Sequence, residues 1–162
     1  MKKVCACALL LLLLAPGCGI TPPTPFAPAS LPETGFTLQT GETRIEGTLA
    51  CDPAGEIRLR FSSPPALTYL TATYADEVFR LDVAGAADTV AARELPTFAP
   101  VLLLCETLRD ALFTQREFKK DGGAYVAALT YGGEKVACRF SPDGRIRRID
   151  CEAKQITIDF QA

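Results

Sequence analysis

Apolar and polar residues alternate with a period of two along much of the chain. The clearest segment is 56–61 (EIRLRF), which places Ile57, Leu59 and Phe61 on one face and charged residues on the other. This alternation predicts strands with one solvated face, as in antiparallel sheets. Short turns separate the segments, so consecutive strands are expected to be neighbours. The other predicted strands are 67–74, 78–83, 89–93, 116–120, 124–131, 134–140, 145–151 and 155–160.

One segment changes from this pattern to helical periodicity. Apolar residues recur at helical spacing from Val101 to Leu112, and Pro100 suits the first turn of a helix, where its missing N–H is not needed. We therefore expect one amphipathic helix at about 99–113, with its charged residues turned toward solvent.

Together these elements predict a mainly β fold of the α+β class. We expect a curved antiparallel half-barrel of about 9–10 strands, with the helix packed in its concavity, because a sheet of that size curls. One helix is too narrow to cover the whole inner face. The concavity is then either filled by side chains or left as an apolar cavity, and Leu104, Leu108 and Leu112 are the candidate cavity or lid residues.

The first residues follow a third pattern. Lys2 and Lys3 precede an apolar run over 4–15, which is too short to span a bilayer and fits the centre of a secretory signal peptide. Residues 15–18 (APGC) resemble the lipobox of bacterial lipoproteins, in which the cysteine is acylated and becomes the mature N-terminus. We expect a signal peptide at 1–17 and lipidation at Cys18, for example with palmitate. An ordinary secreted protein and a buried helix are the alternatives.

Five prolines between residues 22 and 32 predict an extended, semi-rigid tether. The expected organisation is a lipidated cysteine and tether at 18–33, followed by a β domain at 34–162. Acyl chains hold a protein on a membrane. The predicted location is therefore extracytoplasmic and membrane-anchored, on the cell membrane or, in a Gram-negative cell, on the outer membrane.

Four cysteines lie beyond the predicted tether, and their state is left open by their spacing. Outside the cytoplasm an even number permits disulfides. Free buried thiols are the second alternative. A metal site is the third, although structural zinc sites usually contain closely spaced cysteine pairs. The candidate residues are Cys51, Cys105, Cys138 and Cys151.

Charge and composition exclude several functions. The predicted mature chain carries 15 basic residues, the 17 of the whole sequence less Lys2 and Lys3, against 19 acidic residues, for a net charge of −4. No basic face typical of nucleic-acid binding is present in the sequence. One local basic cluster is either a solvated sheet face or a docking patch for an acidic partner. Its members are Lys135, Arg139, Arg145, Arg147 and Arg148.

Candidate catalytic groups are few. The sequence has no histidine, which excludes Ser-His-Asp and Cys-His catalysis. Asp76 and Glu77 are adjacent carboxylates, but we expect them in an exposed turn, where nothing desolvates either group. Gly122-Gly123 and Gly132-Gly133 precede strands rather than helices, so they are expected to form hairpin turns and not phosphate sites. We predict no enzyme activity, no cofactor and no metal.

A set of short segments within residues 36–160 carries a family resemblance. The segments are 47–49 (GTL), 57–61 (IRLRF) with Pro64 and Pro65, 67–70 (LTYL), 78–85, 108–112 (LRDAL) and 143–146 (DGRI). They resemble the LolA/LolB family of lipoprotein carriers, and in pattern most nearly the GerS-type germination lipoproteins of spore-forming Gram-positive bacteria. The resemblance implies an incomplete β-barrel with a helical lid. It also implies a binding or adaptor role toward another envelope protein, for instance a cell-wall hydrolase. The alternative is carriage of an acyl chain, lipid or lipoprotein in an apolar cavity.

Overall fold

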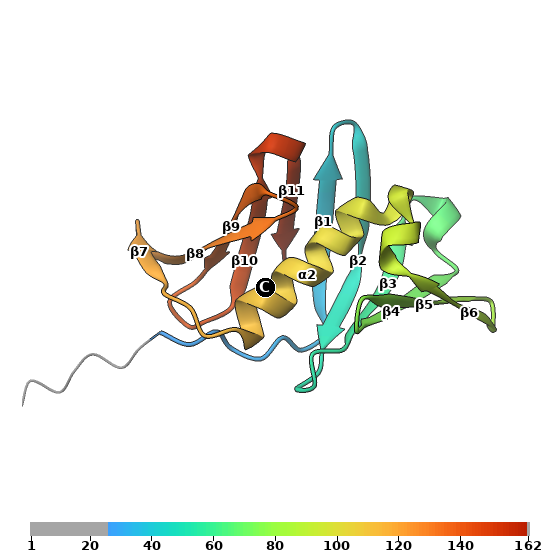
Figure 1. Ribbon diagram of the computed structural model, residues 1–162, viewed down its shortest axis with the longest axis horizontal. Coiled ribbons are helices and arrows are strands. Elements are labelled where there is room, and N and C mark those ends of the chain that lie inside the picture. The colour runs from blue at the N-terminus through green and yellow to red at the C-terminus, as the bar shows by residue number, and fades with distance from the viewer. Residues whose placement is uncertain (1–25, 162) are drawn as a thin grey trace, which may run out of the picture.

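The fold is a single curved antiparallel sheet with one helix packed against it (Figure 1). The computed structural model describes residues 26–161. The sheet contains eleven strands in the order β6-β5-β4-β3-β2-β1-β11-β10-β9-β8-β7 and is not closed into a barrel. This confirms the predicted mainly β class and the half-barrel with a helix in its concavity.

The sheet consists of two meanders joined through the first and last strands. Strand β1 pairs with β2 on one side and with β11 on the other, where Phe36 lies opposite Phe160. The first six strands are β1 (Thr34–Thr40), β2 (Thr43–Cys51), β3 (Ile57–Ser63), β4 (Leu70–Ala75), β5 (Val78–Val83) and β6 (Ala86–Ala91). The last five are β7 (Lys119–Asp121), β8 (Ala124–Tyr131), β9 (Glu134–Phe140), β10 (Ile146–Cys151) and β11 (Ile156–Phe160).

The strand count exceeds the expected nine or ten because of one hairpin. Residues Gly41 and Glu42 form a two-residue turn between β1 and β2, and Gly41 has φ +55°. A glycine at the first turn position is typical of this hairpin class. The polar residues around it hide the alternation that would otherwise separate the two strands.

Three other predicted strands have different bounds. The predicted strand 67–74 begins only at Leu70, because Pro65–Leu67 form a 3-10 helix. The predicted strand 89–93 is β6, which ends before the 3-10 helix Ala92–Glu94. Of 116–120, only the last two residues belong to a strand, β7. In each case a 3-10 helix or a segment without regular secondary structure replaces one end of the expected strand.

Helix α2 (Ala99–Phe113) has the predicted range, with Pro100 in its first turn. It follows the 3-10 helix Pro96–Phe98 and crosses the concave face of the sheet (Figure 1). Its buried residues are Val101, Leu103, Leu104, Cys105, Thr107, Leu108 and Ala111. Among the described residues, no helix combines the length and apolarity needed to cross a bilayer.

The concavity under the helix is filled. Leu104 and Leu108 are fully buried, and they belong to the same core as Phe36, Phe79 and Phe140 from both halves of the sheet. Complete burial of a leucine side chain contributes about 1.5–3 kcal/mol. The middle of the helix therefore acts as a core element that joins the two meanders.

Candidate functional site

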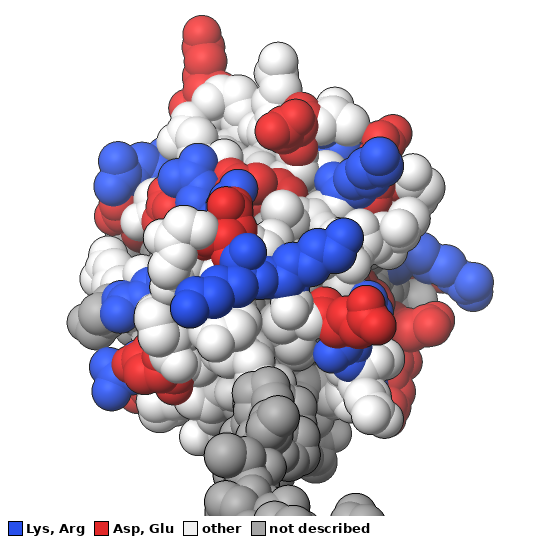
Figure 2. Space-filling model, turned by 90° about the vertical axis from the view of Figure 1, so that its left-hand side faces the viewer, with Lys and Arg blue, Asp and Glu red and all other residues white. Residues whose placement is uncertain are grey.

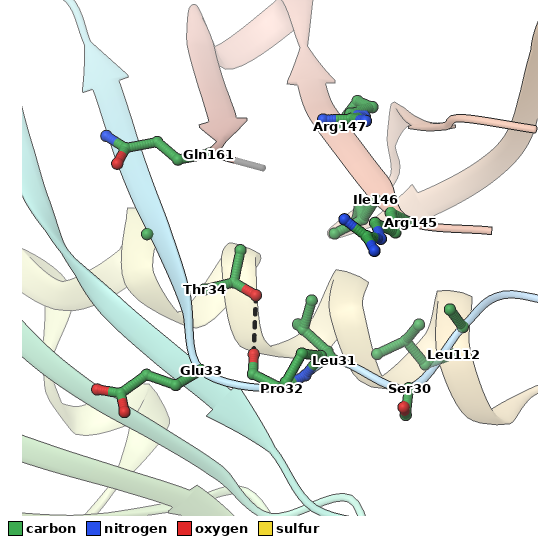
Figure 3. Close-up of a pocket in the computed structure, with 12 residues that line it drawn as sticks. Ser30, Leu31, Pro32, Glu33, Thr34, Leu112, Arg145, Ile146, Arg147 and Gln161 are labelled. Atoms are coloured by element: carbon green, nitrogen blue, oxygen red, sulfur yellow. Dashed lines mark hydrogen bonds between the residues drawn. The ribbon is translucent and has the colours of Figure 1, made fainter. Parts of the chain in front are cut away.

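A pocket that combines apolar and basic side chains lies beside the end of α2 and not beneath its middle. It has a volume of about 500 Å³ and is bounded by the segment before β1, the last turn of α2 and the start of β10. Figure 3 shows Leu31 and Leu112 on one side and Arg145 and Arg147 on the other. Ile146 adds a third apolar side chain to the lining.

One wall of this pocket comes from the predicted tether. We call residues 26–33 the strap. The Phe26 ring stacks on Tyr125 with centroids 4.0 Å apart, and its edge meets Phe118 at 4.8 Å. Further along, the Ala29 amide donates to the Gly144 carbonyl at 2.9 Å, and Leu31 is buried. This part of the tether therefore lies against the sheet, past the lower end of α2 in Figure 1.

The turn before β10 is shaped to receive the strap. Ser141 to Gly144 form the turn that the sequence predicts, with the Gly144 amide donating to the Ser141 carbonyl at 2.9 Å. Gly144 has φ +85°, and a Cβ atom there would lie 2.9 Å from both the Ala27 carbonyl oxygen and the Ala29 nitrogen. The position thus needs glycine both for its backbone conformation and for the close approach of the strap.

A β-bulge directs Arg147 to the pocket. Ile146 lies opposite Phe140 and Arg148 lies opposite Arg139, so β10 contains one extra residue, Arg147. Strict alternation would place residues three apart on opposite faces of the sheet. The bulge allows Ile146 and Ile149 both to be buried, and it turns Arg147 to the pocket lining.

The two arginines of the pocket have different partners. The Nε atom of Arg145 lies 3.3 Å from an Asp143 carboxylate oxygen. A hydrogen bond from the Ser141 hydroxyl, assisted by Arg145, lowers the pKa of Asp143. Arg147 is exposed, and among residues 26–161 no carboxylate forms an ion pair with it. Arg147 is therefore more available than Arg145 to interact with an anionic ligand.

Among the described residues, Glu33 is the one acidic residue that lines the pocket, and its carboxylate contacts residues outside it. The Glu33 carboxylate accepts a hydrogen bond from the Thr48 hydroxyl at 3.1 Å and lies 4.0 Å from the Arg60 guanidinium. In Figure 3 it points away from Arg145 and Arg147. The arginine side of the pocket therefore keeps its positive character.

The predicted basic cluster does not form one patch. Arg139 and Arg148 are adjacent but form ion pairs with acidic neighbours, so their charge is largely balanced. These neighbours are Asp121, Asp150 and Asp159. Lys135 lies at the other end of β9, opposite Thr130. Figure 2 shows basic and acidic side chains interspersed on this end of the molecule. Only Arg145 and Arg147 line the pocket.

Of the three predicted lid leucines, only one lines the pocket. Leu104 and Leu108 are core residues, whereas Leu112 is only partly buried and lines the pocket. The structure therefore brings together Leu112 from one predicted group and Arg145 and Arg147 from another. Leu31 and Ile146 also line the pocket, although neither was among the predicted site residues. The irregular order of residues 145–149 (RIRRI) is the one local signal of the bulge.

All four cysteines of the domain carry free thiols in the structure. Cys105, Cys138 and Cys151 are buried, and Cys51 is partly buried. Burial raises the pKa of Cys51 to about 11 and that of Cys138 to about 12. It also raises the pKa of Cys105 well above its usual value. These thiols are protonated at neutral pH and are weak nucleophiles.

The remaining candidates lie away from the pocket. Asp76 and Glu77 are exposed, both with positive φ, in the predicted hairpin turn between β4 and β5. Within residues 26–161, no group of three or more cysteine, aspartate or glutamate side chains is arranged to hold a metal ion. Cys18 and the predicted signal peptide lie outside the described residues.

Comparisons with known proteins identify no family. No protein-family model matches the sequence, and no curated protein matches it. Several solved structures, among them the following two, are distantly similar. The structure of PNGF-II has a TM-score of 0.40 and 6% identity over 83% of this chain, which spans only 28% of the PNGF-II chain. LprF from Mycobacterium bovis has a TM-score of 0.37 and 10% identity, over 81% of this chain and 84% of LprF. The resemblance to GerS-type lipoproteins stays a prediction.

Proposed function

We propose that this chain is a membrane-anchored extracytoplasmic lipoprotein that binds an amphiphile with an anionic head group and does not transform it. The observation that carries the proposal is the pocket beside α2, which combines apolar side chains with Arg145 and Arg147. The anchor is the expected lipid on Cys18.

The apolar part of the ligand would contact Leu31, Leu112 and Ile146. The pocket volume, about 500 Å³, lies within the range of known small-molecule sites. Leu112 is only partly buried, so its side chain has apolar surface to lose to a ligand. An acyl chain supplies surface of this kind without any polar group that would need a partner.

The anionic head group would lie at Arg147, with Arg145 beside it. Guanidinium is always charged near neutral pH and offers two parallel N–H donors to a carboxylate or phosphate. Arg147 has no competing acidic partner within the described chain, whereas Arg145 already interacts with Asp143. The shared chemistry is a carboxylate or phosphate joined to an acyl chain, as in a fatty acid or an anionic phospholipid.

A fluorescence titration tests this proposal. The protein is the mature chain, residues 18–162, with Cys18→Ser, so that no lipid of its own competes. The probe is a dansyl-labelled fatty acid with a free carboxylate, and its methyl ester is the neutral control. The acid should bind more tightly than the ester by about tenfold or more, because hydrogen bonds to charged groups contribute about 1.5–3 kcal/mol.

Variants assign that preference to the pocket. Arg147→Ala should remove most of the difference between acid and ester and leave ester binding unchanged. Arg80→Ala is the matched control, since Arg80 is also exposed but lies on β5. Equal binding of acid and ester by the parent protein would exclude an anion site, and no binding of either would exclude the proposal. Native mass spectrometry after mild extraction checks for a co-purifying lipid.

The second candidate is the adaptor role toward another envelope protein, such as a cell-wall hydrolase. The observation that favours it is exposed apolar surface beside β4 and β5, away from the pocket. Tyr69 is 77% exposed and Val83 is 51% exposed. Strand β6 is also an open edge with one charged residue, Asp88, and such edges can accept a further strand. A photo-crosslinker in place of Tyr69 should capture one envelope protein in cells. A crosslinker at Arg58, on β3, is the control.

A further inference from the structure

We propose that the strap docks and undocks as a unit, and that a ligand in the pocket holds it docked. Ligand loading would then set how far the domain can reach from its membrane anchor. This inference rests on the proposed function and on lipidation at Cys18. It adds control of the distance between domain and membrane by the bound ligand.

The strap forms part of the binding site. Residues 29–33 line the pocket that contains Arg145 and Arg147. Another pocket, of about 280 Å³, shares residues 29–31 and Leu112 with it and adds Pro28, Cys51 and Phe113. The strap thus separates two hollows at the end of α2. If it left the sheet, both would lose a wall and the ligand would lose its contact with Leu31. A ligand that binds the docked state more tightly shifts the equilibrium toward that state.

The strap is held by contacts that can be lost together. They are the ring contacts of Phe26, the burial of Leu31, two backbone hydrogen bonds and the contacts of the exposed Glu33 carboxylate with Thr48 and Arg60. These bonds run from the Ala29 amide to the Gly144 carbonyl at 2.9 Å and from the Cys51 amide to the Leu31 carbonyl at 3.1 Å. Other strap residues, among them Ser30 and Pro32, are exposed. Segments with few buried contacts open at a lower free-energy cost than the core.

Docking also changes the free length of the tether. With the strap docked, the chain between Cys18 and Phe26 can span at most about 28 Å, at roughly 3.5 Å per residue. With the strap undocked, the free chain extends to Thr34 and its maximum span doubles to about 56 Å. A loaded domain would be kept near the bilayer, and an empty one would reach farther from it.

Hydrogen exchange tests the coupling directly. The mature chain with Cys18→Ser is exchanged with and without the dansyl-labelled fatty acid. Exchange of the amides of Ala29 and Cys51 reports the two strap hydrogen bonds. Ligand should slow both by about fivefold or more, the lower end of typical coupling between sites. A peptide from β11 supplies the reference and should not change.

Reciprocity provides a second, independent test. Phe26 does not line the pocket, but it anchors the strap on Tyr125. Phe26→Ala should therefore weaken fatty-acid binding by about fivefold or more, because coupling acts equally in both directions. Phe26→Tyr keeps the ring and should bind like the parent. Tyr69→Ala removes an exposed ring far from the strap and is the control.

The outcomes separate the two proposals. If the fatty acid binds but leaves exchange at Ala29 and Cys51 unchanged, the coupling is wrong and the pocket assignment stands. The same holds if Phe26→Ala folds and binds with parental affinity. If the parent protein binds no fatty acid, both proposals are wrong. The exchange measurement needs no substitution in the strap, so it decides the question even if Phe26→Ala does not fold.

Discussion

The hydroxyl of Tyr74 on β4 donates a hydrogen bond to the carboxylate of Glu106 on α2. The Tyr74 ring is fully buried, and the Arg109 guanidinium carbon lies 5.7 Å from its centroid. The charged residues of the helix were expected to face solvent, but Glu106 and Arg109 also contact the tyrosine and are only partly exposed. This contact joins the helix to the half of the sheet that contains β4, away from the pocket.

Removal of that hydroxyl should destabilise the fold. We expect Tyr74→Phe to lower the free energy of unfolding by about 1–3 kcal/mol, since the partly buried Glu106 carboxylate loses its donor. Denaturant unfolding followed by circular dichroism measures the change. The matched control is Tyr69→Phe, at a ring that is 77% exposed, where the change should stay within about 0.5 kcal/mol. Equal effects of the two substitutions would contradict a stabilising role for the Tyr74 hydroxyl.

Stability should fall at alkaline pH. Burial raises the pKa of Tyr74, Cys51, Cys105 and Cys138 in the folded state. Each group is an acid that the fold keeps protonated, so the unfolded state binds fewer protons once the pH passes the unfolded pKa. The stabilisation is fully present below about pH 9 and is lost progressively toward pH 12. Unfolding midpoints in urea from pH 7 to 11 test this, and a flat profile above pH 9 would contradict it.

The glycine at the strap contact gives a sharper prediction. Gly144→Ala adds a Cβ atom 2.9 Å from two strap atoms at φ +85°. Gly85→Ala adds one at φ +89° with no atom within 4 Å. Both substitutions should incur a backbone cost of about 1–3 kcal/mol. Only Gly144→Ala should also speed amide exchange at Ala29. If the two variants show the same exchange there, the strap does not depend on this contact.

Thiol counting tests the state of the cysteines. In the mature protein, denatured without reductant, we expect Cys51, Cys105, Cys138 and Cys151 all to react with iodoacetamide, and mass spectrometry counts the added groups. In the folded protein Cys51 should react first, because it is the least buried. Loss of two labelled sites in the denatured sample would instead show a disulfide.

The lipid anchor is tested by one substitution. Cys18→Ala should leave the protein unlabelled by radioactive fatty acid and release it from the membrane fraction. Cys51→Ala is the control, since it removes a thiol from the folded domain and should keep both label and membrane location. A Cys18→Ala protein that stays acylated would show that the lipobox assignment is wrong.

Local periodicity accounts for most of what the sequence predicts correctly. Alternation in β3 and helical spacing in α2 depend on neighbouring residues and on one buried face, which a sequence displays directly. The hairpin at Gly41 and the late start of β4 were missed for a local reason too. Polar residues flank the turn at Gly41, and Pro64 and Pro65 precede β4. In both places the apolar–polar alternation is lost where the backbone turns.

The pocket could not be predicted in the same way. Leu31, Leu112 and Ile146 come from the strap, the helix end and a late strand, and only tertiary packing brings them together. Arg147 lines the pocket because of an inserted residue in β10, which breaks the alternation used to assign faces. Proline content predicts an extended tether, but it carries no information about docking against the sheet.

The pairing of β1 with β11 has a consequence for biogenesis. One edge of β1 pairs with β11, the last strand in the sequence. The two meanders therefore cannot join until almost the whole domain is available. Contacts so distant in sequence slow folding. If the predicted signal peptide directs export from the N-terminus, the sheet would assemble only after β11 has crossed the membrane.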